Sequence, residues 1–261
     1  MVNFLIQPNS VIKNLNCIER AEEMWKLFQP YADDNFQIEF NRELSHAQRY
    51  SEMFFGCALI KAGFSLQRRE GRQGPDLLVN VLGKKLWIEV VTPVPGTYKT
   101  TEVIERIGPH GILGKIVPDK IMLKVLSVAR DKALKYREYL AQGVVTSDDI
   151  CMVAINTGTL AGHCGMDVVK ALLGFEVEWY FDGQGVETEV VRRTTLKKNP
   201  DTVVPSGIFS VEGEYSHISG ALFAHAGVGN IDDVPVGVVH NKYSQNIIPK
   251  GVFSQFKEYR Y

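Results

Sequence analysis

The sequence predicts one domain of the α/β class, with a mixed central sheet and a β-rich C-terminal extension. Three observations support this fold class. Residues 46–156 read as a helix, three strands, a second helix and a strand. Residues 150–156 are an unbroken apolar run, which is typical of a buried central strand. Residues 157–261 hold short strand-like runs with many glycines, and no Pro/Gly/Ser linker separates them from the rest.

Residues 1–45 are expected to form an N-terminal extension with one helix and one strand. Apolar residues at helical spacing predict a helix at 17–29, which Pro30 ends. The alternating sequence FQIEF predicts a strand at 36–40.

The core is expected to begin with a helix at 46–62, capped by Ser45 and ended by Gly63. Strands are predicted at 64–69, 76–82 and 85–92. A second helix is predicted at 118–141, with Pro118 at its start and Gly143 after its end. Between them, residues 93–117 form a long connection, for which a substrate-contacting loop and a short helix at 100–107 are both open.

The C-terminal extension is expected to add strands to the sheet or to form a flanking β layer. The strand-like runs are 175–181, 186–192, 208–211, 218–224 and 236–239.

Two acids on the hairpin formed by residues 74–93 are the most informative feature. A two-residue turn at Gly83-Lys84 pairs Leu78 with Glu89, and Asp76 with Val91. Asp76 and Glu89 then become diagonal neighbours on one face, about 5–7 Å apart. Two close carboxylates on an apolar hairpin repel each other, and Mg²⁺ or Mn²⁺ would relieve that repulsion. The alternative is an edge hairpin whose acids face solvent.

These residues resemble the PD-(D/E)XK, or restriction-endonuclease-like, nuclease superfamily. Its Pro-Asp and acid-x-Lys motifs match Pro75-Asp76 and Glu89-Val90, and the resemblance covers about residues 46–156. It implies an α-β-β-β-α-β core and a metal held by Asp76, Glu89 and the Val90 carbonyl. Val91 stands at the lysine position, but members of this family can carry that lysine on a neighbouring helix. The wider pattern also looks like a group of poorly characterised bacterial proteins.

Lys132 is the best candidate for the displaced lysine. On helix 118–141 its neighbours at helical spacing are Val125, Val128, Ala129 and Tyr136. A lysine among apolar residues either extends its amine to water or has an acidic partner, and both readings are open. Lys124 is the next candidate. The solvent-facing side of this helix is expected to carry Lys120, Lys124, Ser127, Asp131 and Lys135.

Glu52 is the second charged residue in apolar company, because helix 46–62 is apolar on most sides. A buried glutamate needs a partner or a metal. Members of the resembled superfamily often carry a glutamate near the metal on this helix, which would add Glu52 to the catalytic residues. A surface ion pair between Glu52 and Arg49 is the alternative.

Basic residues border the proposed site on two sides. Those expected to contact nucleic-acid phosphates are Arg69, Arg72, Lys115, Lys120 and Lys124. A solvated helix face is the alternative. The Gly114-Lys115 pair fails as a P-loop, because Pro109 replaces the first glycine and Ile116 the Ser or Thr. Histidine spacing does not fit a zinc hydrolase, and no G-x-S-x-G sequence occurs.

Composition sets the remaining expectations. The chain has 261 residues, of which 45% are hydrophobic and 23% charged, with a net charge of -1, so any nucleic-acid affinity must come from local patches. Four separated cysteines predict reduced thiols in a cytoplasmic protein, and neither a leader nor a membrane span is expected.

The leading hypothesis is a Mg²⁺- or Mn²⁺-dependent nuclease that hydrolyses phosphodiester bonds, with DNA as its partner. The competing hypothesis is a catalytically inactive module of the same fold that binds nucleic acid or a protein. A homodimer is left open in both cases.

Overall fold

A computed structural model describes residues 5–6, 10, 12, 14–68, 73–94, 104–107, 113–160, 165–181, 186–227 and 234–260. The fold is α/β, with a mixed seven-stranded central sheet in the order β1-β2-β3-β6-β11-β12-β13. These strands are β1 (Leu66–Gln67), β2 (Leu77–Val81), β3 (Lys84–Val91), β6 (Ile150–Asn156), β11 (Gly220–Ala224), β12 (Gly237–His240) and β13 (Lys257–Tyr259).

The middle of the sheet is parallel. β6 pairs parallel with both β3 and β11, whereas β1, β2 and β3 form an antiparallel meander. β12 is antiparallel to β11 and parallel to β13. Three strands of the C-terminal part, β11, β12 and β13, therefore extend the same sheet.

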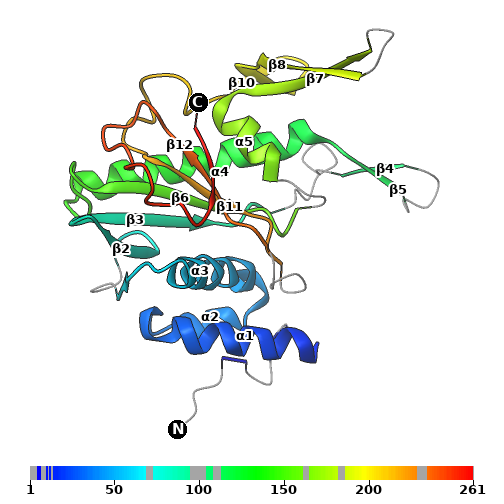
Figure 1. Ribbon diagram of the computed structural model, residues 1–261. Helices are drawn as coiled ribbons and strands as arrows, with labels where there is room; N and C mark the ends of the chain where they lie inside the picture. The colour runs from blue at the N-terminus through cyan, green and yellow to red at the C-terminus, as the bar shows by residue number, and fades with distance from the viewer. Residues whose placement is uncertain are drawn as a thin grey trace.

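Helices cover both faces of this sheet (Figure 1). They are α1 (Leu15–Phe28), the short 3-10 helix η1 (Gln29–Tyr31), α2 (Phe36–Phe40), α3 (Glu43–Lys61), α4 (Pro118–Ala141) and α5 (Gly165–Leu173). α1, α2 and α3 lie on one face, and α4 and α5 on the other. Successive β3 residues alternate between the two cores, with Ile88 and Val90 in the first and Trp87 in the second.

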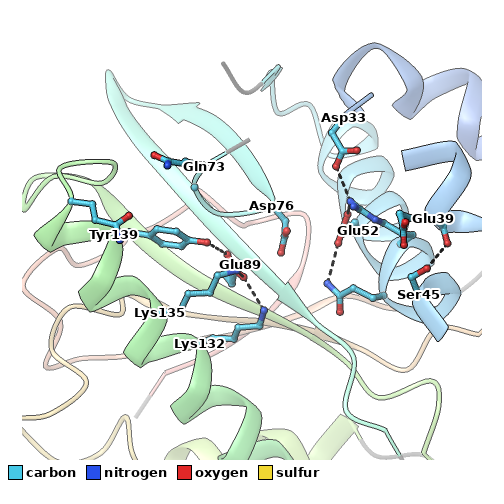
Figure 2. A pocket seen from close by; sticks show the side chains of 14 residues that line it. Asp33, Glu39, Ser45, Glu52, Gln73, Asp76, Glu89, Lys132, Lys135 and Tyr139 are labelled. Atoms are coloured by element: carbon cyan, nitrogen blue, oxygen red, sulfur yellow. Dashed lines mark hydrogen bonds and ion pairs between the residues drawn. The ribbon is translucent and has the colours of Figure 1, made fainter. Parts of the chain in front are cut away.

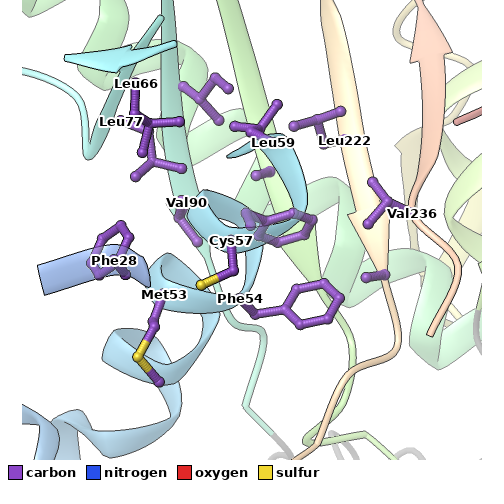
Figure 3. Close-up of a cluster of buried hydrophobic side chains, with 14 of the residues drawn as sticks. Phe28, Met53, Phe54, Cys57, Leu59, Leu66, Leu77, Val90, Leu222 and Val236 are labelled. Carbon is purple, nitrogen blue, oxygen red and sulfur yellow. The ribbon is translucent and has the colours of Figure 1, made fainter. Parts of the chain in front are cut away.

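The core beneath α3 explains why that helix is apolar on most sides. Figure 3 shows Leu77, Val90 and Leu222 of the sheet near α3, which contributes Cys57 and Leu59. On its other side, α3 contacts α1, and Gly56 allows the two helices to approach. A Cβ at Gly56 would lie 2.4 Å from the Phe28 ring. The helix that carries Glu52 is thus held on two sides.

Several predicted elements are confirmed at their boundaries. α4, β6, β7 (Phe175–Phe181) and β8 (Val186–Arg192) match the predicted ranges. The predicted helix at 17–29 corresponds to α1. The predicted strand at 64–69 shortens to β1, and that at 218–224 to β11.

The strand predicted at 36–40 is wrong, because these residues form helix α2. In a helix, Phe36 and Phe40 share a face, and both are buried, while Ile38 is 49% exposed. Stacking of Phe36 on Trp25 and Phe40 fixes this packing. The cap predicted at Ser45 is also wrong, because α3 begins at Glu43 and the Ser45 hydroxyl donates to the Glu39 carbonyl.

Three further two-stranded sheets are present in the described part of the chain. They are β4 (Ile104–Ile107) with β5 (Leu113–Ile116), β7 with β8, and β9 (Thr195–Asn199) with β10 (Thr202–Pro205). β4 replaces the helix considered for 100–107, of which residues 100–103 lie outside the described ranges. The strand predicted at 208–211 is absent, and α5 was not predicted. None of the described helices combines the length and apolar character that a membrane span requires.

Candidate functional site

Asp76 lies directly across from Glu89 at the open end of the β2–β3 pair. The register joins Leu77 to Ile88, so the next step outward places Asp76 opposite Glu89. Beyond the end of β2, the Asp76 Oδ2 atom accepts a hydrogen bond from the Val90 N–H at 2.8 Å. The carboxylate thus replaces the strand partner that Val90 has lost.

This register corrects the predicted turn. Val81 pairs with Lys84, so the two turn residues are Leu82 and Gly83, with φ angles of 50° and 79°. Positive φ at both positions is typical of a type I′ turn. The turn lies one residue earlier than predicted, which shifts each partner along β3 by two residues. A shift of two keeps every side chain on its face, so the two acids still share one.

Glu89 is fully buried and receives two lysines from α4 (Figure 2). Its Oε1 atom accepts from Lys132 Nζ at 2.8 Å and from Lys135 Nζ at 2.5 Å. Its Oε2 atom lies 3.4 Å from the Tyr139 hydroxyl. Of the alternatives for Lys132, the acidic partner is the one the structure shows.

Lys135 was predicted to face solvent, and this is wrong for its amine. Lys135 lies three residues after Lys132, and Tyr139 lies four residues after Lys135, so the three side chains form one stripe along α4. That spacing was the available signal. The amine lies over the Tyr139 ring as well as against Glu89. Burial opposes the charge of Lys135, but the hydrogen bond and charge of Glu89 more than offset it and raise its pKa.

Glu52 lies on α3, the helix across the cavity from α4. It is 5% exposed, and its two oxygens accept from Gln48 Nε2 at 3.1 Å and from Arg49 at 2.8 Å. Arg49 also donates to Asp33 at 2.8 Å. The ion pair with Arg49 is therefore present, and it is partly buried beside the site rather than on the surface.

Asp76 lies between these two groups (Figure 2). Burial, the charge of Glu52 and the charge of Glu89, in that order, raise its pKa well above the ordinary value. Lys132 and the Val90 N–H act in the other direction but do not cancel the shift. Ionised Asp76 is therefore costly in the absence of a further positive charge.

A cavity of about 620 Å³ joins these groups. All three proposed catalytic carboxylates and both lysines line it, together with residues from the N-terminal extension, which sequence reasoning had not connected to the site. The lining consists of Asp33, Glu39, Ser45, Gln48, Arg49, Glu52, Gln73, Gly74, Asp76, Glu89, Lys132, Lys135, Tyr139 and Gln142.

The donors in this cavity suit a hard divalent cation better than zinc. Among the described residues, no three of the His, Cys, Asp and Glu side chains are grouped closely enough to form a metal cage. Magnesium needs no such cage, because it takes one or two carboxylates and keeps several waters. Asp76 and Glu89 would provide two carboxylates, and the Val90 carbonyl, which accepts from the cavity residue Gln48, would provide a neutral oxygen.

Of the five predicted nucleic-acid contacts, the structure describes the side chains of two, Lys120 and Lys124. Lys120 and Lys124 lie on α4 but are not among the lining residues. Lys124 Nζ donates to the Val94 carbonyl at 3.0 Å, and partial burial lowers its pKa. Arg69 and Arg72 lie outside the described residues, as does the side chain of Lys115.

Comparisons with known proteins do not assign this fold to a family. No family model matches the chain. Neither the curated proteins nor the solved structures contain a significant match.

Proposed function

We propose that the chain is a metal-dependent nuclease of the PD-(D/E)XK type. The observation that carries this proposal is the placement of Asp76 opposite Glu89, with two α4 lysines on Glu89 and Glu52 facing them across one cavity. Apart from the β4–β5 pair between β3 and α4, the order α3-β1-β2-β3-α4-β6 supports the same fold assignment.

Asp76, Glu89 and the Val90 carbonyl would hold Mg²⁺ or Mn²⁺. When bound, the cation would activate a water nucleophile and stabilise charge on phosphate oxygens. Its arrival would also offset the repulsion that raises the pKa of Asp76. Two carboxylates that destabilise each other in the metal-free chain are thereby suited to share one positive ion.

Lys132 and Lys135 would have different roles in the reaction. The Lys132 side chain is 19% exposed and that of Lys135 is 42% exposed. The more buried Lys132 would orient the attacking water and hold charge that develops on the phosphate. Lys135, nearer to solvent, would contact the incoming phosphodiester. Further phosphate contacts would come from Arg69, Arg72, Lys115, Lys120 and Lys124, with DNA as the proposed substrate.

One observation favours a second function, a non-catalytic module that binds nucleic acid or a protein. Two ammonium groups already neutralise Glu89, and Val91 replaces the lysine of the strand motif. In this alternative, the Lys–Glu cluster only ties α4 to the sheet.

A metal titration combined with a cleavage assay tests the proposal. Mn²⁺ should bind the wild type by calorimetry and raise its melting temperature, and Asp76→Ala should remove both effects. Plasmid DNA, single-stranded DNA and RNA should then be incubated with Mg²⁺ or Mn²⁺. Metal-dependent cleavage that is lost in Asp76→Ala supports the nuclease. Absence of both metal binding and cleavage in the wild type favours the binding module.

A further inference from the structure

The side-chain amide of Gln48 connects Glu52, which lies on the same helix α3, to the end of strand β3. Its Nε2 donates to Glu52 Oε1 at 3.1 Å and to the Val90 carbonyl at 3.0 Å. Its Oε1 accepts from the Thr92 N–H at 3.2 Å. The amide orientation follows from these partners, because a backbone N–H can only donate and a carbonyl can only accept.

These bonds occur where β3 extends beyond β2. The Val90 N–H is taken by Asp76, and the Val90 carbonyl by Gln48. Since the Thr92 N–H also binds Gln48, the exposed edge of β3 is satisfied by two side chains instead of a strand. One of them is a proposed metal ligand, and the other contacts a second carboxylate of the site.

We infer that Gln48 is a positioning residue for the proposed metal site, an inference that rests on the proposed nuclease function. Gln48 and Glu52 are four residues apart on α3 and therefore share a face. A single amide thus fixes Glu52 relative to the Val90 carbonyl. A carbonyl oxygen has two lone pairs, so the bond from Gln48 leaves one for a cation. The amide is neutral, so it orients both oxygens without adding a positive charge that would repel the metal.

A purely structural role predicts a different outcome, and Ser51 provides the matched control. The Ser51 hydroxyl bonds the Thr92 hydroxyl at 2.7 Å and accepts from Asn156 at 2.8 Å. It therefore also ties α3 to the end of β3, but its hydroxyl bonds go to Ala47, Thr92 and Asn156 instead of the Glu52 carboxylate and the Val90 carbonyl. Both Gln48→Met and Ser51→Ala remove bonds between α3 and the end of β3, but only the first releases the Glu52 carboxylate and the Val90 carbonyl, the latter a proposed ligand.

Calorimetric titration of the full chain with Mn²⁺ alone distinguishes the two roles. Gln48→Met should raise the Mn²⁺ dissociation constant by about 10–100-fold, as for other residues that orient metal ligands. Ser51→Ala should bind Mn²⁺ as the wild type does. Cleavage by Gln48→Met should recover when the Mn²⁺ concentration is raised, which lost packing would not produce. If circular dichroism shows that Gln48→Met is misfolded, Gln48→Ala replaces it, since alanine favours the helix.

The outcomes distinguish failure of the positioning role of Gln48 from failure of the proposed nuclease function. Unchanged Mn²⁺ affinity in a folded Gln48 variant, with a wild type that binds Mn²⁺, overturns the positioning role and leaves the nuclease proposal standing. Equal weakening by Gln48→Met and Ser51→Ala overturns it as well. A wild type that binds no Mn²⁺ overturns both.

Discussion

Asp76 and Glu89 face each other across the open end of an antiparallel strand pair, and one of them is fully buried. Each has a different partner: Asp76 binds the Val90 backbone, while Glu89 binds two lysines. Two ammonium groups therefore neutralise Glu89. For Asp76, burial and the charges of Glu52 and Glu89 raise the pKa. Because their partners differ, substitutions of the two acids should have different measurable effects.

Glu89→Gln should abolish Mn²⁺ binding. The amide keeps the size of the side chain and an acceptor oxygen for the lysines, but it removes the negative charge that a hard cation requires. We expect the Mn²⁺ dissociation constant to rise by more than about 100-fold. This exceeds the loss of affinity caused by changing residues that only orient ligands. Calorimetry on the purified variant measures this.

Asp149→Asn is the matched control for that variant. Asp149 is also a buried acid, but its carboxylate accepts from the Trp87 indole at 3.1 Å and caps Thr146, outside the cavity. It should lower stability without changing Mn²⁺ affinity. Unchanged Mn²⁺ affinity in Glu89→Gln would contradict the shared metal site.

Lys132→Met should reduce cleavage by roughly 100-fold, as for loss of a preorganised electrostatic group, while Mn²⁺ still binds. Lys135→Met should instead raise KM for DNA with a smaller effect on kcat, because its amine is more exposed. Lys124→Met, outside the cavity, should act mainly through DNA affinity. Steady-state kinetics at several DNA concentrations separate these effects. Full activity in Lys132→Met would transfer the catalytic role to Lys135.

Local patterns predicted the elements whose signals are strong. Pro118 at the start of α4, Gly143 beyond its end and the apolar run of β6 predicted both elements at their boundaries. The FQIEF segment failed because five residues with three apolar positions fit either period, and packing against Trp25 decides for the helix. The pattern within a five-residue segment cannot predict a contact with a residue on another helix.

The convergence of four charged residues was predicted, but the details of their arrangement were not. Asp76, Glu89, Lys132 and Glu52 do meet at one cavity. The turn was placed one residue late, because Gly83 is acceptable at either position of a two-residue turn. Lys135 was assigned to solvent because a helical wheel places its Cα at the edge, whereas its long side chain reaches Glu89. Gln48 was missed because only the end of β2 creates its partners.

Tyr136→Phe should destabilise the fold by about 1–2 kcal/mol, because a buried hydroxyl is lost from two carbonyls. Its oxygen lies 2.9 Å from the Trp87 carbonyl and 2.8 Å from that of Met152, bridging β3 and β6 under α4. Urea unfolding measures the loss. Tyr139→Phe is the control, since its hydroxyl contacts the Lys135 amine and, at 3.4 Å, Glu89 Oε2, and so does not bridge the two strands. An equal loss in both variants would contradict the bridge.

The raised pKa of Asp76 makes stability depend on pH in a defined direction. A carboxyl whose pKa is higher in the folded chain binds its proton more tightly there than in the unfolded chain. Stability therefore falls as pH rises from the unfolded pKa, near 4, through the raised folded pKa. Above that window, ionised Asp76 opposes folding of the metal-free chain.

Asp76→Asn should accordingly stabilise the metal-free protein at pH 8 but not at pH 4. The amide oxygen can still accept from the Val90 N–H, so the substitution removes the charge and keeps the bond. We therefore expect a higher free energy of unfolding for the variant than for the wild type at pH 8. Urea unfolding in EDTA at both pH values measures it. Saturating Mg²⁺ should reverse the order at pH 8, because only the wild type gains stability from the ion. A variant less stable than the wild type at pH 8 in EDTA would contradict the raised pKa.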